Sequence, residues 1–491
     1  MTDGGEVTGR RAAPGQRGTA LLLREPARPA LVREHPLAPW FAVGTVCFGA
    51  FMGQLDASVV TLAFPAMQRH FGAGLAEVQW VSLAYLLTLV ALLVPVGRWS
   101  DRAGRKLVYL LGFAAFAASS AGCGLAPSLG VLIALRVVQA AAAAMLQANS
   151  VALVAASVPA RARRAGLAVQ AAAQALGLAA GPVAGGVLVA SVGWRWIFFV
   201  NVPVGLVAVL AGWYLLPRTR QRAARKGTDP VEIGLLAAAA VTLMLAVSVL
   251  AGLGLPGWTA AVLAAAAASA WAGLAWWERR SAAPLIDLPL VASSGMLPAL
   301  GGALCGYLVL FAPLVLLPQV LAAGGHGAAR AGLMLVALPA GFGVAALAGE
   351  RALPARWPDR RRCVAGGLLA GFGVAMLAIP AASVIWPALV LTGAGLGIYI
   401  PANNAQVMAA VPASDAAMAG GMVNMTRGLG TALGVATATL GLHSEVLVGR
   451  PDAMTLAVAA LVAATAAATW AAARSGGRAG ACSSPGVGEG T

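Results

Sequence analysis

Apolar residues along the chain fall into blocks of roughly 20 residues, separated by short polar segments. A block of this length can cross a hydrocarbon layer of about 30 Å as an α-helix. The pattern predicts fourteen membrane-spanning helices, at residues 39–63, 80–97, 107–126, 129–157, 165–191, 196–216, 231–251, 258–277, 296–321, 331–349, 363–381, 385–410, 417–442 and 453–473. Polar tails flank them at 1–38 and 474–491 and are predicted to be disordered. The predicted class is an all-α polytopic membrane protein.

Lysine and arginine are distributed unequally between the two faces that these spans define. Of the 33 basic residues, 27 lie in the tails and loops on the side of the N-terminus, and four lie in loops on the opposite side. Cytoplasmic loops carry the excess of basic residues in membrane proteins. An even number of spans places both ends of the chain on one face. We therefore predict a bacterial inner (plasma) membrane protein with both termini in the cytoplasm.

The composition supports this interpretation and disfavours several others. Hydrophobic residues make up 60% of the chain and charged residues only 10%, whereas a soluble domain carries about a quarter charged residues. The net charge of +16 sits in short loops, so it indicates topology and not nucleic-acid binding. Lys106 and Lys226 both follow arginine, so neither completes the Gly-Lys pair of a phosphate-binding loop. With no metal-ligand spacing among the cysteines and no His or acid cluster in the spans, we expect no cofactor, no metal and no enzymatic activity.

The loop between the second and third spans carries a dense motif of Gly97, Asp101, Arg102, Gly104 and Arg105. Its glycines permit a tight hairpin, and its acid and bases can form a switchable ion-pair cluster at the mouth of a cavity. A gating loop is the functional interpretation. The alternative is a charged loop that only sets topology.

The fifth span contains a run of small residues around one proline, formed by Gly177, Gly181, Pro182, Gly185 and Gly186. Glycines four residues apart allow two membrane helices to approach closely, and proline kinks a helix. A plain packing face is the structural alternative.

Two charged residues lie inside the spans of the first half, Asp56 and Arg136. A charge at the bilayer centre costs about 2.5–3.5 kcal/mol on insertion scales, so such residues are candidates for function. Burial favours the neutral form of Asp56, which suits a proton carrier. Alternatively, Asp56 is hydrogen-bonded near the outer interface, and Arg136 extends to that interface. Glu77, which we expect at an interface, remains the second candidate carrier.

These motifs together resemble one protein family. The first loop, the Arg136-x-x-Gln139 pattern and the Gly177–Gly186 run resemble signature motifs of the major facilitator superfamily, and the last is typical of its antiporters. Ala140 departs from the usual glycine after Gln139. Residues near Asp56 and Trp194–Gly205 resemble the fourteen-helix drug:proton antiporter branch. The resemblance runs from about residue 40 to 445 and implies two six-helix bundles around a central cavity, with two inserted helices.

The resemblance divides the chain into a first bundle at 39–216, a linker with the inserted pair at 217–295 and a second bundle at 296–473. It implies a proton-coupled antiporter that exports a small hydrophobic or cationic organic compound, such as a drug or antibiotic. Protons, the cargo and the lipid bilayer are the expected partners of a monomer. Asp56 and Arg136 would couple the proton.

Four polar residues are predicted to face the cavity: Gln139, Asn403, Asn424 and Arg427. For Arg427, pairing with a neighbour is the alternative. A proton-coupled importer of the same fold, disfavoured by the fifth-span motif, and a non-transporting receptor or scaffold remain the rival functions.

Overall fold

A computed structural model describes residues 28–219, 229–250, 255–281, 295–323, 334–354, 356–379, 381–412, 415–448 and 453–475. Within these ranges the chain forms helices, turns and irregular segments, and no β-strand. Most of the two predicted disordered tails, at 1–27 and 476–491, lies outside the described residues. Ala30–Arg33, in the remainder of the first tail, forms a short helix, α2.

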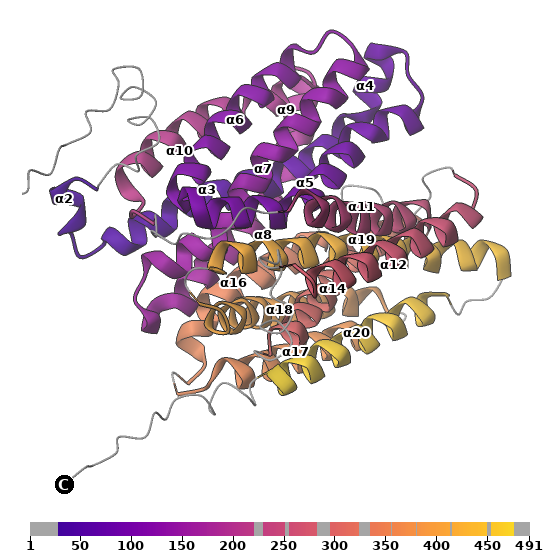
Figure 1. The fold of residues 1–491 in the computed structure, drawn as a ribbon. Coiled ribbons are helices and arrows are strands. Elements are labelled where there is room, and N and C mark those ends of the chain that lie inside the picture. The colour runs from indigo at the N-terminus through magenta and orange to yellow at the C-terminus, as the bar shows by residue number, and fades with distance from the viewer. Residues whose placement is uncertain are drawn as a thin grey trace, which may run out of the picture.

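The first half of the molecule contains six long helices and, besides α2, four short ones. The long helices are α3 (Ala38–Val59), α5 (Leu75–Ala103), α6 (Arg105–Leu125), α7 (Leu129–Ser157), α8 (Arg163–Ser191) and α10 (Asn201–Leu215). The short ones are η1 (Val60–Ala63), α4 (Phe64–Phe71), η2 (Ala160–Ala162) and α9 (Trp196–Phe199). In Figure 1 these helices, indigo to magenta, form the upper part of the molecule.

The second half contains six long helices. They are α14 (Met296–Ala323), α16 (Ala337–Ala352), α17 (Asp359–Met376), α18 (Ala382–Ala409), α19 (Ala416–Val448) and α20 (Ala453–Ser475). The two halves meet where α19 packs against α5 and α7, and where α8 packs against α16 and α18.

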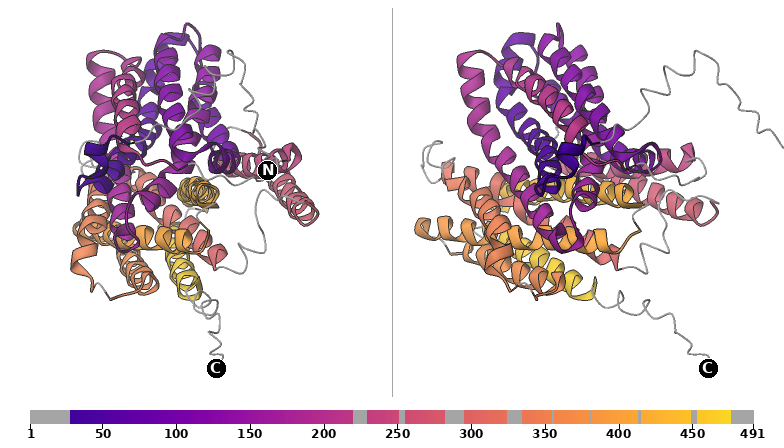
Figure 2. Two further views of the ribbon diagram at one scale, coloured as in Figure 1. Left: turned by 60° about the vertical axis from the view of Figure 1, so that its left-hand side comes forward. Right: turned by 90° about the vertical axis from the view of Figure 1, so that its left-hand side faces the viewer.

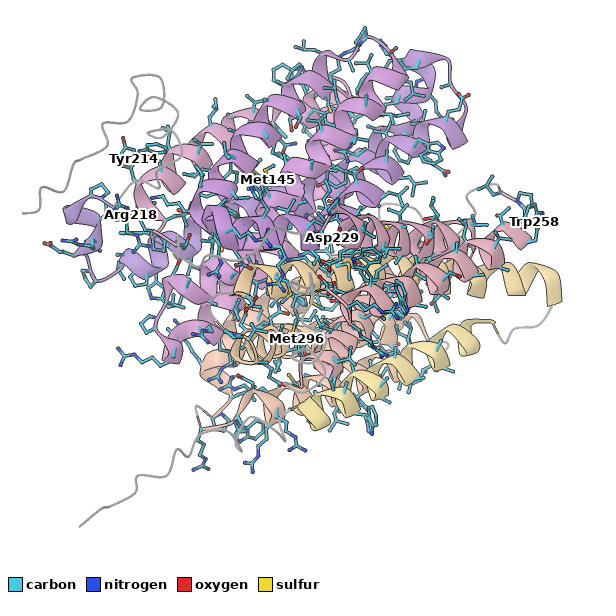
Figure 3. The ribbon with its side chains drawn as sticks, viewed as in Figure 1. Met145, Tyr214, Arg218, Asp229, Trp258 and Met296 are labelled. Carbon is cyan, nitrogen blue, oxygen red and sulfur yellow. The ribbon has the colours of Figure 1, made fainter. Side chains whose placement is uncertain are left out.

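Between the first and the second half, the sequence forms a helical hairpin of α11 (Pro230–Leu250) and α12 (Trp258–Glu278). α12 packs against α11, which in turn contacts α5 and α19, so the hairpin attaches through one helix. Only 17% of the most apolar stretch of α12 is buried inside the protein. Figure 2 shows the pair, in rose, projecting from one side of the molecule, and Figure 3 places Trp258 at its outer edge.

The fourteen long helices correspond one for one to the fourteen predicted spans, which confirms the predicted fold class. In the described part of the chain, nine helices are long and apolar enough to cross a membrane. Some helices extend past the predicted ends. α5 begins five residues earlier because the Glu77 side chain accepts a hydrogen bond from the backbone N–H of Gly74 and so caps it.

The break between α5 and α6 is fixed by Gly104, whose φ of 106° is accessible to glycine and strained for other residues. Two residues after it, the buried Lys106 donates hydrogen bonds to the carbonyl oxygens of Trp213 (2.8 Å) and Leu216 (2.9 Å). A lysine at this position caps the C-terminal end of α10, where helix carbonyls lack partners. The loop is thereby fastened to the body of the first half.

Candidate functional site

A buried ion pair lies in the middle of the first half. Arg136 on α7 donates from Nη1 to Oδ2 of Asp56 on α3 at 2.7 Å, and both side chains are at most 1% exposed. Opposite charges in contact compensate each other where neither could be hydrated. The sequence predicted that these two residues act together in proton coupling, and the structure adds that their side chains are in contact. Because Asp56 already contacts Arg136, movement of either side chain has to break this contact.

Three polar side chains surround the pair. Gln139 Nε2 donates to Asp56 Oδ1 at 3.2 Å, and Asn201 Nδ2 donates to the same oxygen at 3.3 Å. Gln139 Oε1 accepts from Arg136 Nη1 at 2.7 Å, and Gln139 also donates to Ser120 Oγ. Gln139 was predicted to face the cavity, but the structure places it in this network, which α3, α6, α7 and α10 hold together.

Tyr85 on α5 connects the ion pair to the central cavity. Its ring lies 4.1 Å from the Arg136 guanidinium carbon, a cation–π contact, and its side chain also lines the cavity. Its hydroxyl is buried and has no hydrogen-bond partner in the described part of the chain. An unsatisfied buried hydroxyl is unusual in proteins. Tyr85 was not a sequence candidate, and nothing in its local pattern distinguishes it from an ordinary core tyrosine.

Glu77, the alternative proton carrier, lies away from this network. It is exposed in the first turn of α5, where its carboxylate caps the helix. A capping role explains its presence, and its exposure does not suit a buried carrier.

A cavity of about 760 Å³ lies between the two halves. Its walls come from α3, α5, α7 and α8 of the first half, from α14, α16 and α19 of the second half, and from the inserted helix α11. Most of the lining is aliphatic, as in sites for small organic molecules. Its uncharged polar side chains are Gln54, Ser58, Tyr85, Gln147, Ser248, Asn424 and Thr431.

Two of the predicted cavity residues line this space. Arg427 donates from Nη2 to Gln147 Oε1, and Asn424 donates to the backbone oxygen of Gln147 at 2.6 Å. Both bonds join α19 to α7 across the interface between the halves. Asn403 is not among the lining residues. It is buried on α18 and donates to the Ala299 carbonyl oxygen at 2.9 Å, so it tethers α18 to α14.

The predicted gating loop clamps the two halves together at one end of the cavity. Asp101 Oδ1 accepts from Arg105 at 2.8 and 2.9 Å, and the two Asp101 oxygens accept from the backbone N–H groups of Ala417 (3.1 Å) and Met418 (3.0 Å). These N–H groups form the first turn of α19, which attracts negative charge. Arg102 lies beside Asp101 in the last turn of α5.

Close backbone approach strengthens this clamp. A Cβ at Gly97 would lie 2.6 Å from the Ala417 carbonyl oxygen, so α5 meets α19 where a side chain does not fit. Next to it, Arg98 Nη1 contacts Asp415 Oδ1 at 2.5 Å, and both side chains are at most 8% exposed. Asp415 was missed because a lone aspartate in a short loop carries no sequence signal. The halves are therefore locked at the end that carries the gating loop.

The glycines of the fifth span face α3. A Cβ at Gly177 would lie 2.5 Å from the backbone oxygen of Phe51, and one at Gly181 would collide with the Ser58 side chain. Gly185 is buried in the same helix. The side-chain surroundings of Pro182 and Gly186 lie outside what the structure describes. The observed contact is the close helix packing expected of this motif, and Ser58 extends it to the cavity wall.

Two helical halves around a central cavity are typical of membrane transporters. A family model described as "Major Facilitator Superfamily" matches residues 46–435. The chain belongs to this superfamily and is a multi-pass membrane protein.

The chain is also similar, over most of its length, to bacterial resistance and export proteins. The chain is 30% identical over 426 residues to the tetracenomycin C resistance and export protein of Streptomyces glaucescens, covering 84% of this chain and 77% of that protein. It is 32% identical over 423 residues to the multidrug resistance protein Stp of Mycobacterium tuberculosis, covering 82% and 78%.

Among solved structures, the human organic anion transporter MFSD10 matches with a TM-score of 0.64 at 17% identity, over 89% of this chain and all of that one. At this identity the likeness shows the fold alone.

Proposed function

We propose that this protein is a proton-coupled antiporter that exports a small, largely apolar organic compound by alternating access. The observation that carries the proposal is the buried Asp56–Arg136 pair, which shares the wall residue Tyr85 with the cavity. A titratable acid beside a substrate cavity supplies the coupling that an antiporter needs. The similarity to resistance and export proteins supports the outward direction. The same similarity to transporters disfavours an enzyme.

The proposed cycle uses the ion pair as its switch. When a proton from outside neutralises Asp56, the attraction to Arg136 is lost and the guanidinium is free to turn toward other partners. Because the Arg136 guanidinium stacks on Tyr85, its movement shifts a wall of the cavity and weakens the binding of cargo. Conversely, bound cargo that holds Tyr85 in place favours the charged pair. Proton and cargo therefore exclude each other.

The locked gate defines the conformation that the structure represents. The basic bias of the loops supports a cytoplasmic location for the Gly97–Arg105 loop and for both termini. We infer a state that is closed to the cytoplasm, in which cargo leaves to the outside and protons enter. Reporter fusions after Pro217 and after Arg474 should both behave as cytoplasmic; an external signal at either position contradicts this orientation.

The proton gradient supplies enough free energy for resistance. One proton that moves inward through about 100 mV yields about 2.3 kcal/mol, and one pH unit adds about 1.4 kcal/mol. For one proton per neutral molecule, the two terms support a concentration ratio of a few hundredfold.

The direct test is transport by the purified protein in sealed liposomes. With a pH gradient imposed across the membrane, a hydrophobic fluorescent dye should move opposite to the protons, and dissipating the gradient with an ionophore should stop it. Movement of dye and protons in the same direction would instead support the importer, and no gradient-dependent movement for any compound of a broad panel would favour a receptor or scaffold.

A further inference from the structure

The charge of the cavity wall narrows the class of cargo. Among the described residues that line the cavity, Arg427 is the one charged side chain, and neither aspartate nor glutamate occurs there. A cavity built for organic cations would be expected to carry at least one carboxylate, since a buried cation needs a counter-charge. The described lining residues instead supply a positive charge, that of Arg427.

The positive charge of Arg427 is not neutralised by the protein. Its guanidinium donates to the amide oxygen of Gln147 and lies 5.9 Å from the centre of the Tyr307 ring. In the described part of the chain no carboxylate pairs with it, whereas Arg136 in the other half has Asp56 at 2.7 Å. The residue is 7% exposed, so bulk water compensates little of its charge.

An uncompensated guanidinium in an apolar cavity attracts an anionic ligand and repels a cationic one. Charges interact more strongly where the dielectric constant is low, and guanidinium matches the two oxygens of a carboxylate. The apolar part of a ligand has a separate surface, since Leu86 and Leu89 of α5, Phe311 of α14 and Val247 of α11 line the same space. Its volume suits a drug-sized molecule.

We propose that the cavity selects an amphipathic organic anion, with its acidic group on Arg427 and its apolar body against the aliphatic wall. This inference rests on the proposed export function and specifies its cargo, in place of the hydrophobic or cationic compound expected from sequence. When one monovalent anion leaves and one proton enters, both movements carry positive charge inward. A membrane potential that is negative inside therefore drives both.

Equilibrium binding to the purified full-length protein tests the charge preference without transport. Fluorescein and rhodamine 6G share one ring system and differ in charge, and Nile red serves as an uncharged probe. The unmodified protein should bind fluorescein at least about tenfold more tightly than rhodamine 6G, or about 1.4 kcal/mol. Arg427→Gln should remove this preference and leave Nile red binding within about twofold, because it removes the charge and keeps hydrogen bonding to Gln147.

Two further variants keep the test decisive. Arg69→Gln, at an exposed arginine of α4, removes the same charge outside the cavity and should leave all three affinities unchanged. If Arg427→Gln also loses Nile red binding, the charge preference is measured in Arg427→Lys, which keeps the positive charge. If this variant still prefers the anion, the proposal is supported.

Three results would overturn the inference: tighter binding of rhodamine 6G than of fluorescein by the unmodified protein, an anion preference that survives in Arg427→Gln, or an Arg427→Lys variant that binds Nile red without preferring the anion. Failure of proton-driven transport, with the anion preference intact, would instead contradict the export function alone.

Discussion

The two halves of the molecule place their buried arginines in different electrical situations. In the first half, Arg136 faces Asp56 and is enclosed by polar side chains away from bulk water. In the second half, Arg427 has an uncharged amide as its partner and lines the cavity. A neutralised pair can respond to a proton, whereas an uncompensated charge can respond to a ligand. The difference suggests that the two coupled tasks of an antiporter are divided between the halves.

Two polar contacts that hold the halves together also differ, here in how far they are exposed to water. Asp101 is almost fully buried and accepts from Arg105 and from two backbone amides of α19. In the second half, Asp359 at the start of α17 contacts Arg164 of α8 at 2.9 Å, with 28% and 21% of the side chains exposed. Water and salt screen such a pair. The contacts of Asp101 should therefore stabilise the closed state more than the Asp359–Arg164 pair does.

The largest expected effect is on the neutralised pair. Asp56→Asn should reduce proton-driven efflux to the background of cells without the protein, because an amide cannot titrate. It also leaves Arg136 buried without a counter-charge, at a cost of about 3–5 kcal/mol. Dye efflux at matched expression and thermal unfolding in detergent measure the two effects.

The double variant Asp56→Asn/Arg136→Gln separates them. With both charges removed, stability should recover while transport stays absent. If Asp56→Asn alone exports against a gradient with normal pH dependence, the coupling acid lies elsewhere.

The next effect concerns helix packing inside the first half. Gly177→Ala should lower export by about tenfold, because its Cβ would press on the backbone oxygen of Phe51 and separate α8 from α3. Gly181→Leu should lose export as well. Although Gly177→Ala adds only one carbon, that carbon has no room beside the Phe51 backbone, so its effect should not be mild. Dye efflux at matched expression compares the variants.

Gly343→Ala is the matched control, since the nearest atom to its Cβ, on Ala175 of α8, lies 4.0 Å away. It should export within about twofold of the unmodified protein. If Gly177→Ala and Gly343→Ala are equally active, the Gly177–Gly186 run has no role beyond ordinary helix packing. The sequence argument for export over import, which depends on this run, would then be lost.

A smaller effect is expected at the stronger clamp. Asp101→Asn removes the negative charge that Arg105 and the first turn of α19 share, and should weaken the closed gate by about 2 kcal/mol, or about 30-fold in the ratio of closed to open molecules. Spin labels on either side of the gate report this ratio as a distance distribution. A distribution unchanged from the unmodified protein would show that the clamp does not hold the gate.

The smallest effect is expected at the second contact. Asp359→Asn should change the same distribution by less than about 1 kcal/mol, since the pair with Arg164 is partly exposed. High salt should reproduce its effect on the unmodified protein. A shift as large as that of Asp101→Asn would contradict the inequality of the two clamps.

The sequence by itself determined the helices and much of the candidate site. Hydropathy is a local property, so fourteen apolar blocks gave fourteen helices with errors only at their ends. Charges such as Asp56 and Arg136 were conspicuous because they are rare in apolar surroundings. Gly104 likewise marks a turn that its positive φ explains locally. These features need no knowledge of distant parts of the chain.

Tertiary structure decided which of these residues meet. Asp56 and Arg136 are 80 positions apart, and Asp101 and Met418 are 317 apart, so no local pattern links them. Packing also excluded Gln139 and Asn403 from the cavity lining and brought in Tyr85. The physical reason is that a polar side chain inside a membrane bundle is satisfied by whichever helix packs against it. The sign of the cavity charge follows from the same fact, because it depends on Arg427 meeting an amide and Arg136 meeting an acid.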